Sequence, residues 1–311
     1  MTIRKTLMAG LIAGTMAAMA TAALAQTKIA IGTSANPEVA ALYVAKQQGI
    51  FEKNGLDATI EIVALNPTLP ASLLADSLQI GTVTPTVFIQ AVDNGLDLSA
   101  IGGVSVVHPG MARVFLVAAP GTNLTKPEDF VGKTVAVPGL NAILHVALQM
   151  WFQKHGVDSA KVTYVEAPLA TVGDLLKSNK VDASIVIDPF LTRIEQSNGG
   201  TLIAPFTLET IEGQQTHFYT TTTAWADANP EAVAAFRKSI QEASDFIAAN
   251  PDQARQDVNA FLKLPPEVVT TLALPKTKIE VEAADVKFFA DVMKGFGLVS
   301  GEIDAAKHVA K

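Results

Sequence analysis

The chain of 311 residues contains no cysteine, and aromatic residues make up only 6% of it. Without cysteine the protein can form no disulfide and offers no thiol for lipid attachment, so its folded state must depend on a hydrophobic core. Two tryptophans and three tyrosines are few for a pocket that stacks sugar rings. The net charge of −7 disfavours nucleic acid and anionic membrane surfaces, so neither is expected as a partner.

Sequence signatures of catalysis are also missing. The chain has no G-x-S-x-G, G-x-G-x-x-G or H-E-x-x-H motif, and its five histidines show no metal-ligand spacing. Gly132-Lys133-Thr134 resembles the end of a P-loop, but Pro127 stands at the position of the first glycine. A strand also follows this motif instead of preceding it. We therefore expect no enzyme, no metal site and no cofactor.

The longest uncharged stretch lies at the N-terminus. Arg4 and Lys5 precede a run from Thr6 to Thr27 that carries no charge and contains Ala23-Leu24-Ala25. This pattern is typical of a secretory signal peptide cleaved after Ala25, and the run has too few leucines and isoleucines to favour a transmembrane anchor. We expect residues 1–25 to be removed and the mature protein to be soluble in the periplasm, without a lipid anchor.

One motif occurs twice in the mature chain. Phe51-Glu52-Lys53-Asn54-Gly55-Leu56-Asp57 returns as Phe152-Gln153-Lys154-His155-Gly156-Val157-Asp158, and residues 73–81 return as residues 175–183, each about 100 residues later. Each copy of the first motif predicts a helix end, a glycine in the left-handed C′ position and then a strand. Any α/β protein can contain a helix, a glycine and a strand in this order. Two matches with nearly the same offset in the sequence nevertheless favour a duplicated domain half. The chain is therefore expected to contain two similar α/β halves.

The remaining patterns extend this plan. An apolar run at 114–119 and a run rich in aromatic and β-branched residues at 218–223 predict two strands that cross between the halves. Thr125-Lys126-Pro127-Glu128 predicts a capping box with Thr125 as N-cap. Four C-terminal helices are expected at residues 230–249, 251–262, 265–272 and 283–295. The expected fold is two three-layer α/β lobes with a helical C-terminal extension. Lobe 1 would comprise residues 26–113 and 220–311, and lobe 2 residues 114–219.

The turns after four predicted strands are the candidate binding positions. Ligands of open parallel sheets bind beyond the carboxyl ends of the strands, and two facing lobes would bring these turns together. The turns open helices, whose free N–H groups and positive dipole ends suit a carboxylate, a sulfonate or a similar anion. The candidate residues are Ser34, Asn36, Thr84, Thr86, Gly139, Leu140, Asn141, Asp188 and Phe190.

Several candidates keep two possible roles. Asp188 ends an apolar strand, so it either accepts a hydrogen bond from a ligand amine or hydroxyl or caps the helix that follows, and both roles are compatible. Phe190 is either an apolar wall of the cleft or a core residue. His108 and His217 flank the crossover strands and either line the cleft or bond to backbone at the hinge. No arginine is clearly directed at the cleft.

Four motifs in order carry a family resemblance: residues 49–57, 129–136, 181–183 and the pair Asp188-Pro189. Together they resemble the nitrate, sulfonate, taurine and thiamine-precursor group of periplasmic substrate-binding proteins for ABC importers. The likeness spans essentially the whole mature chain and implies a type II periplasmic binding protein fold that closes like a hinge. It carries the family's binding positions over to Asn36, Thr84, Thr86, Gly139, Leu140, Asn141 and Asp188.

The resemblance implies a receptor that binds a small anionic or polar organic solute of the sulfonate, taurine, nitrate or carboxylate class. This receptor would deliver its solute to the transmembrane subunits of a permease and is expected to be a monomer. Family members with an enzymatic role in thiamine-pyrimidine synthesis look dependent on a cysteine-containing signature. This chain has no cysteine, so the resemblance does not favour that enzymatic branch. Two alternatives stay open: a sensor subunit that presents ligand to a membrane receptor and, less favoured, a periplasmic enzyme on the same fold.

Overall fold

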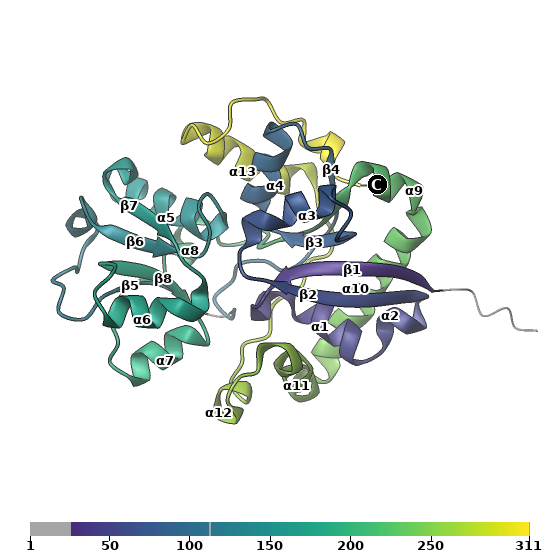
Figure 1. The fold of residues 1–311 in the computed structure, drawn as a ribbon, viewed down its shortest axis with the longest axis horizontal. Coiled ribbons are helices and arrows are strands. Elements are labelled where there is room, and N and C mark those ends of the chain that lie inside the picture. The colour runs from purple at the N-terminus through teal and green to yellow at the C-terminus, as the bar shows by residue number, and fades with distance from the viewer. Residues whose placement is uncertain (1–25, 112, 311) are drawn as a thin grey trace, which may run out of the picture.

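The computed structural model describes residues 26–111 and 113–310 (Figure 1). The expected signal peptide, residues 1–25, lies outside these described residues. Two five-stranded sheets form the centres of two lobes that lie side by side. Helices surround both sheets, so the expected two-lobe α/β architecture with C-terminal helices is confirmed.

The sheet of the first lobe has the strand order β2-β1-β3-β10-β4. Its strands are β1 (Thr27–Ser34), β2 (Leu56–Val63), β3 (Ile80–Val83), β4 (Leu98–Gly103) and β10 (Phe218–Thr222). β1 pairs in parallel with β2 and β3, whereas β10 runs antiparallel between β3 and β4. Because β10 follows the whole second lobe in the sequence, the chain returns to complete the first sheet.

The second sheet repeats this plan with the order β7-β6-β8-β5-β9. Its strands are β5 (Val114–Ala118), β6 (Thr134–Val137), β7 (Thr163–Glu166), β8 (Ala183–Ile187) and β9 (Thr201–Ala204). β6 pairs in parallel with β7 and β8, and β5 runs antiparallel between β8 and β9. Each sheet thus contains one antiparallel strand at the fourth position of its strand order. These two strands, β10 and β5, are the predicted crossover strands. The lobe boundaries at 113/114 and 219/220 stay a prediction, and β10 begins before the second of them.

Helices cover both faces of each sheet, which gives each lobe three layers. In the first lobe one face is covered by α1 (Ala40–Gln47), α2 (Ile50–Lys53), α10 (Pro230–Ala249) and α11 (Pro251–Leu262), and the other by α3 (Leu69–Leu74), α4 (Pro85–Asp93) and α13 (Ala283–Gly295). In the second lobe the helices are α5 (Ile143–Lys154) and α8 (Phe206–Thr210) on one face and α6 (Val172–Lys177) and α7 (Phe190–Gln196) on the other. Two short helices, α9 (Thr223–Ala228) and α12 (Pro266–Val269), complete the set.

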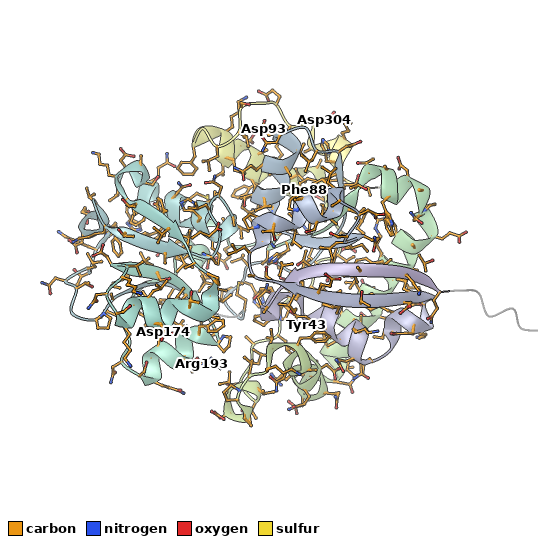
Figure 2. The ribbon with its side chains drawn as sticks, in the orientation of Figure 1. Tyr43, Phe88, Asp93, Asp174, Arg193 and Asp304 are labelled. Atoms are coloured by element: carbon orange, nitrogen blue, oxygen red, sulfur yellow. The ribbon has the colours of Figure 1, made fainter. Side chains whose placement is uncertain are left out.

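Buried aromatic side chains fix the helices on both faces of the first sheet. Tyr43 and Phe88 lie on opposite sides of this sheet (Figure 2). Tyr43 stacks on Phe261 with ring centroids 4.5 Å apart, and Phe88 meets Phe218 of β10 edge-on at 5.6 Å. Burying a side chain of this size contributes about 2–3 kcal/mol, so these contacts hold α1 against α11 and α4 against β10.

Local predictions were confirmed where the deciding signal lies within a few residues. Helices α10, α11 and α13 have the predicted bounds, and Gly55 and Gly156 have left-handed φ values of 85° and 75°. The capping box was shifted by one residue, because Asp129, rather than Glu128, accepts from the backbone N–H of the preceding turn. In the described part of the chain, no helix combines the length and the apolar character needed to cross a bilayer.

Candidate ligand-binding cleft

A cavity of about 380 Å³ lies between the two lobes. The first lobe contributes the segment after β1 and Thr84 after β3, and the second contributes Pro138 after β6 and Ile187 at the end of β8. His217, just before β10, lines it as well. The cavity thus lies beyond the carboxyl ends of the parallel strands of both sheets, where open α/β sheets bind ligands.

Five of the candidate residues line this cavity, namely Ser34, Asn36, Thr84, Phe190 and His217. Asn36 is fixed in place because its side-chain Oδ1 accepts a hydrogen bond of 2.9 Å from the Glu38 N–H and so caps the following helix. Most of the wall is apolar, with Ile62, Ile143 and Leu169 among its side chains.

The other candidates lie beside the cavity. Thr86 is fully buried, with its Oγ1 3.5 Å from that of Thr84. Gly139, Leu140 and Asn141 form the turn between β6 and α5, and α5 itself begins later than predicted, at Ile143. His108 accepts a hydrogen bond at Nδ1 from the Gly110 N–H, which is the backbone-bonded role left open for it.

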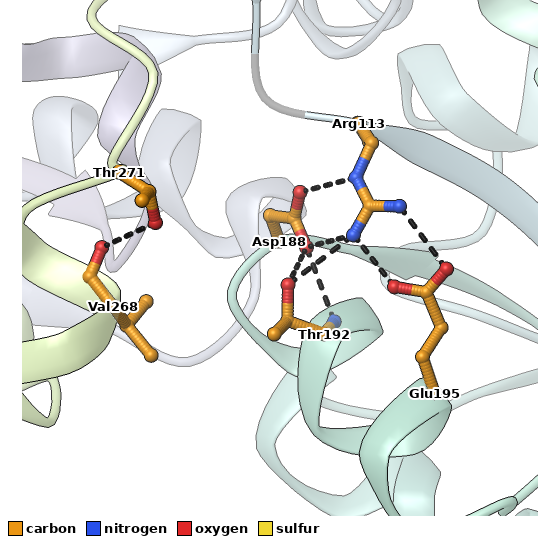
Figure 3. Close-up of polar contacts among 6 residues, drawn as sticks. All are labelled: Arg113, Asp188, Thr192, Glu195, Val268 and Thr271. Carbon is orange, nitrogen blue, oxygen red and sulfur yellow. Dashed lines mark hydrogen bonds and ion pairs between the residues drawn. The ribbon is translucent and has the colours of Figure 1, made fainter.

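Asp188 is held by protein groups on several sides (Figure 3). Its Oδ1 accepts from the Thr192 N–H at 3.1 Å and from the Thr192 hydroxyl at 2.8 Å, which caps the first turn of α7. Arg113 donates from Nε to its Oδ2 at 2.9 Å and from Nη2 to Glu195 at 2.7 Å. Of the two roles left open for Asp188, the helix cap is the one seen, together with an ion pair to Arg113.

The turns offer fewer free N–H groups than the sequence suggested. The backbone N–H groups of four turn residues donate to side chains of the protein itself, so the expected anion cradle is wrong at these positions. The donors are Glu38 to Asn36 Oδ1, Thr84 to Asn66 Oδ1, Leu140 to Glu166 Oε2 and Asn141 to His145 Nδ1. Among residues 26–111 and 113–310, neither lysine nor arginine lines the cavity.

A buried polar network instead forms part of the cavity wall. Ser105 donates from Oγ to Glu38 Oε2 at 2.9 Å, the hydroxyls of Ser105 and Thr216 are 2.7 Å apart, and Thr216 Oγ1 lies 3.1 Å from His217 Nδ1. Glu38 is only 5% exposed, and this burial raises its pKa to about 7 although the Ser105 hydrogen bond opposes the shift. Burial likewise lowers the pKa of His217 to about 4, so its imidazole is neutral at pH 7.

Sequence reasoning missed Glu38, Ser105, Thr216 and Asn66. Glu38 follows Asn36-Pro37 in the first turn of a helix, where an acidic residue is an ordinary stabilising choice, so nothing marked it as buried. Ser105 and Thr216 are far apart in the sequence and meet where the two crossing segments pair at Val106 and Gln215. The only available signal was that both flank predicted crossover strands.

The two lobes approach each other closely next to the cavity, beside Asn66 and Pro138, which line it. A Cβ added to Gly139 would lie 3.2 Å from Pro67 Cδ of the first lobe and 3.1 Å from Ala142 Cβ. A glycine at this turn therefore permits the close approach of the lobes.

The NMT1/THI5-like family model matches residues 36–254. This chain belongs to the NMT1/THI5-like family. A relative from Brucella abortus, described as a binding protein, is 25% identical over 247 residues, which cover 78% of this chain and 71% of the relative. A Haemophilus influenzae relative described as a thiamine biosynthesis protein is 27% identical over 272 residues, which cover 84% of this chain and 80% of the relative.

Solved structures share the fold of this NMT1/THI5-like chain. The alkanesulfonate-binding protein SsuA from Xanthomonas axonopodis pv. citri, bound to MOPS, aligns with a TM-score of 0.78 at 21% identity and covers 91% of this chain and 98% of its own. The periplasmic nitrate-binding protein NrtA from Synechocystis PCC 6803 aligns with a TM-score of 0.75 at 14% identity, covering 90% and 84%. At these identities the likeness shows the periplasmic binding protein fold.

Proposed function

We propose that this chain is the solute-binding component of an ABC importer. It is exported to the periplasm, binds a small polar organic solute between its lobes as a monomer and presents the closed form to the transmembrane subunits of the permease. The family membership, the names of the similar proteins and the position of the cavity support this proposal.

The observation that carries the proposal is a cavity lined by both lobes. Its volume of about 380 Å³ falls in the range of small-molecule sites. A solute in it contacts both lobes at once and therefore binds the closed arrangement more tightly than an open one. Such differential binding is what a receptor needs if the permease is to distinguish the loaded from the empty form.

A thermal-shift screen of residues 26–311 against amines, amino acids, sulfonates, nitrate, carboxylates and nucleobases tests the proposal. A solute at 100 times its Kd adds about 2.7 kcal/mol to the free energy of unfolding and so raises the Tm. Small-angle scattering should then show a smaller radius of gyration with that solute. If no solute raises the Tm, the proposed function is wrong.

A matched pair of variants locates the binding site. Ile62 and Leu74 are both exposed, by 47% and 62%, but only Ile62 lines the cavity. Ile62→Arg should abolish the shift in Tm because it places a bulky charge at the cleft, whereas Leu74→Arg should leave it unchanged. An equal response of both variants would contradict this placement of the site.

Two alternatives remain for the same fold. A sensor subunit would bind the same solute, and its partner would be a membrane receptor, which crosslinking in membranes distinguishes from a permease. The absence of enzymatic activity also stays a prediction. If it is correct, NMR should show that a bound solute is chemically unchanged after prolonged incubation with the protein.

A further inference from the structure

The cavity wall contains one carboxylate oxygen without a protein partner. Glu38 is 95% buried and lines the cavity, and its Oε2 accepts from Ser105. Among the described residues only Oε2 has a hydrogen-bond partner, and Oε1 is not among the atoms sealed off inside the protein, so it is accessible from the cavity. No charged group contributes to the raised pKa of Glu38, so no cation of the protein neutralises it. A buried carboxylate left in this condition is costly unless something else bonds to it.

The hydrogen-bond chain behind Glu38 determines what His217 offers to the cavity. Each hydroxyl has one hydrogen to donate. Ser105 gives its hydrogen to Glu38, so Thr216 must donate to Ser105, and Thr216 in turn accepts from the Nδ1–H of His217. A neutral imidazole that carries its hydrogen on Nδ1 has an acceptor at Nε2. No protein donor bonds to this Nε2 in the described residues, and His217 lines the same cavity.

Glu38 and His217 therefore provide two hydrogen-bond acceptors, whereas anion-binding groups are scarce. No lysine or arginine of the described chain lines the cavity, and the N–H groups of Glu38 and Thr84 already donate to Asn36 and Asn66. An anion bound here would lie close to a carboxylate without a countercharge. A group with N–H donors would match both acceptors, and the apolar walls would cover the rest of the solute.

We propose that the cleft selects a small solute with an amine, amidine or amino-heterocyclic group on an apolar body, bound by Glu38 and His217 as acceptors. This inference rests on the proposed solute-binding function and defines the chemical class of its ligand. Glu38 sets the charge preference, because a positively charged N–H group gains from the carboxylate and loses less on burial than it would alone.

Isothermal titration of residues 26–311 with a defined set of probes tests the proposal. The nitrogen probes are benzamidine, phenethylamine and 2-aminopyridine, and the anionic probes are hexanesulfonate and nitrate. At least one nitrogen probe should bind, and Glu38→Gln should weaken it about 10- to 100-fold, the value of one charge-assisted hydrogen bond. Glu61→Gln is the matched control, because Glu61 is an exposed carboxylate on β2 outside the cavity, and it should change nothing.

The pH dependence separates a direct contact from a structural role of Glu38. The affinity of benzamidine, which is cationic throughout, should rise from pH 6 to pH 8 as Glu38 loses its proton, and Glu38→Gln should flatten this profile. His217, the other titratable side chain on the cavity wall of the described residues, stays neutral over this range. Tyr43, whose hydroxyl donates to the Ser34 carbonyl nearby, also stays neutral because burial raises its pKa.

Each outcome decides the matter. Binding of a nitrogen probe that Glu38→Gln does not weaken overturns the inference, and so does binding of hexanesulfonate or nitrate while the nitrogen probes fail. In both cases the solute-binding function would stand. If neither these probes nor the wider screen gives a bound solute, the proposed function fails as well.

Discussion

Replacing Glu38 by glutamine should stabilise the ligand-free protein at pH 8. Burial raises the pKa of Glu38 from 4.5 to about 7, which means that the folded state disfavours the ionised form. This difference in pKa corresponds to about 3 kcal/mol of folding free energy. Glutamine has nearly the same shape, and its side-chain oxygen can still accept the hydrogen bond from Ser105.

The sign of the pH dependence follows from proton binding. Between pH 4.5 and 7 the folded protein holds a proton on Glu38 that the unfolded chain has released, so wild-type stability from this group falls as pH rises. The loss is complete above pH 7. His145 and His217, with pKa values lowered to about 4, act in the opposite direction and cost stability as pH falls from 6.5. They are present in both proteins, so the difference between wild type and variant isolates Glu38.

Urea unfolding at pH 4.5, 6, 7 and 8, followed by tryptophan fluorescence, measures this difference. The two proteins should be about equally stable at pH 4.5, and the variant should gain about 3 kcal/mol by pH 8. Glu61→Gln controls for loss of an exposed carboxylate. A difference between Glu38→Gln and wild type that does not change with pH would refute the reasoning, because it would show that Glu38 is ionised equally in both states.

Three further predictions concern other parts of the cleft. Asn66→Ala should lower the free energy of unfolding by about 2–3 kcal/mol, because Asn66 bonds the Thr82 carbonyl at 2.7 Å and the Thr84 N–H at 3.0 Å, and both groups are buried. Gly139→Ala should weaken every cleft ligand about fivefold in titration, since its methyl group resists the approach of the lobes. Arg113→Met should cost about 1 kcal/mol or less in urea unfolding and leave ligand affinity unchanged, because its ion pairs are partly exposed.

The Asn66 and Gly139 variants each have a matched control. Asn123→Ala removes an exposed loop amide and should stay within about 0.5 kcal/mol of wild type. Gly173→Ala adds a methyl group to α6 of the same lobe with only Ile194 at 3.9 Å, so it should not affect affinity. Unchanged affinity in Gly139→Ala would show that closure leaves room at Pro67, and weaker binding in Arg113→Met would place its ion pairs in the site.

The fold was predictable because its signals are local and repeated. Proline at the start of α10 and α11 fixes where those helices begin, and glycine with a left-handed φ fixes where α2 and α5 give way to strands. The crossover strands were recognisable outside the two repeats, one as an apolar run and the other as a run of aromatic and β-branched residues. The prediction of the capping residue was wrong where two neighbouring acidic residues could both fill the role, because Asp129 and not Glu128 completes the capping box.

The chemistry of the site was less predictable because it depends on distant partners. The turn at Thr84 suggested a free N–H, but that group bonds to Asn66, which arrives from the loop after β2. The N–H of Leu140 is likewise taken by Glu166 at the end of β7. A sequence pattern shows that a helix begins at a turn, whereas the partner that consumes its N–H groups is set by the packing of the sheet.

The free-energy cost of burying the Glu38 carboxylate links the chemistry of the ligand to its binding affinity. In the ligand-free protein the carboxylate lowers stability at pH 8, although glutamine would fit and would avoid this cost. A bound N–H donor lowers the pKa of Glu38 toward its ordinary value and so recovers part of about 3 kcal/mol. That recovery occurs only when the cavity is occupied, because the described protein supplies no countercharge of its own. It thus contributes to ligand binding a free energy that an anion could not obtain, and the same residue that destabilises the empty receptor makes it selective.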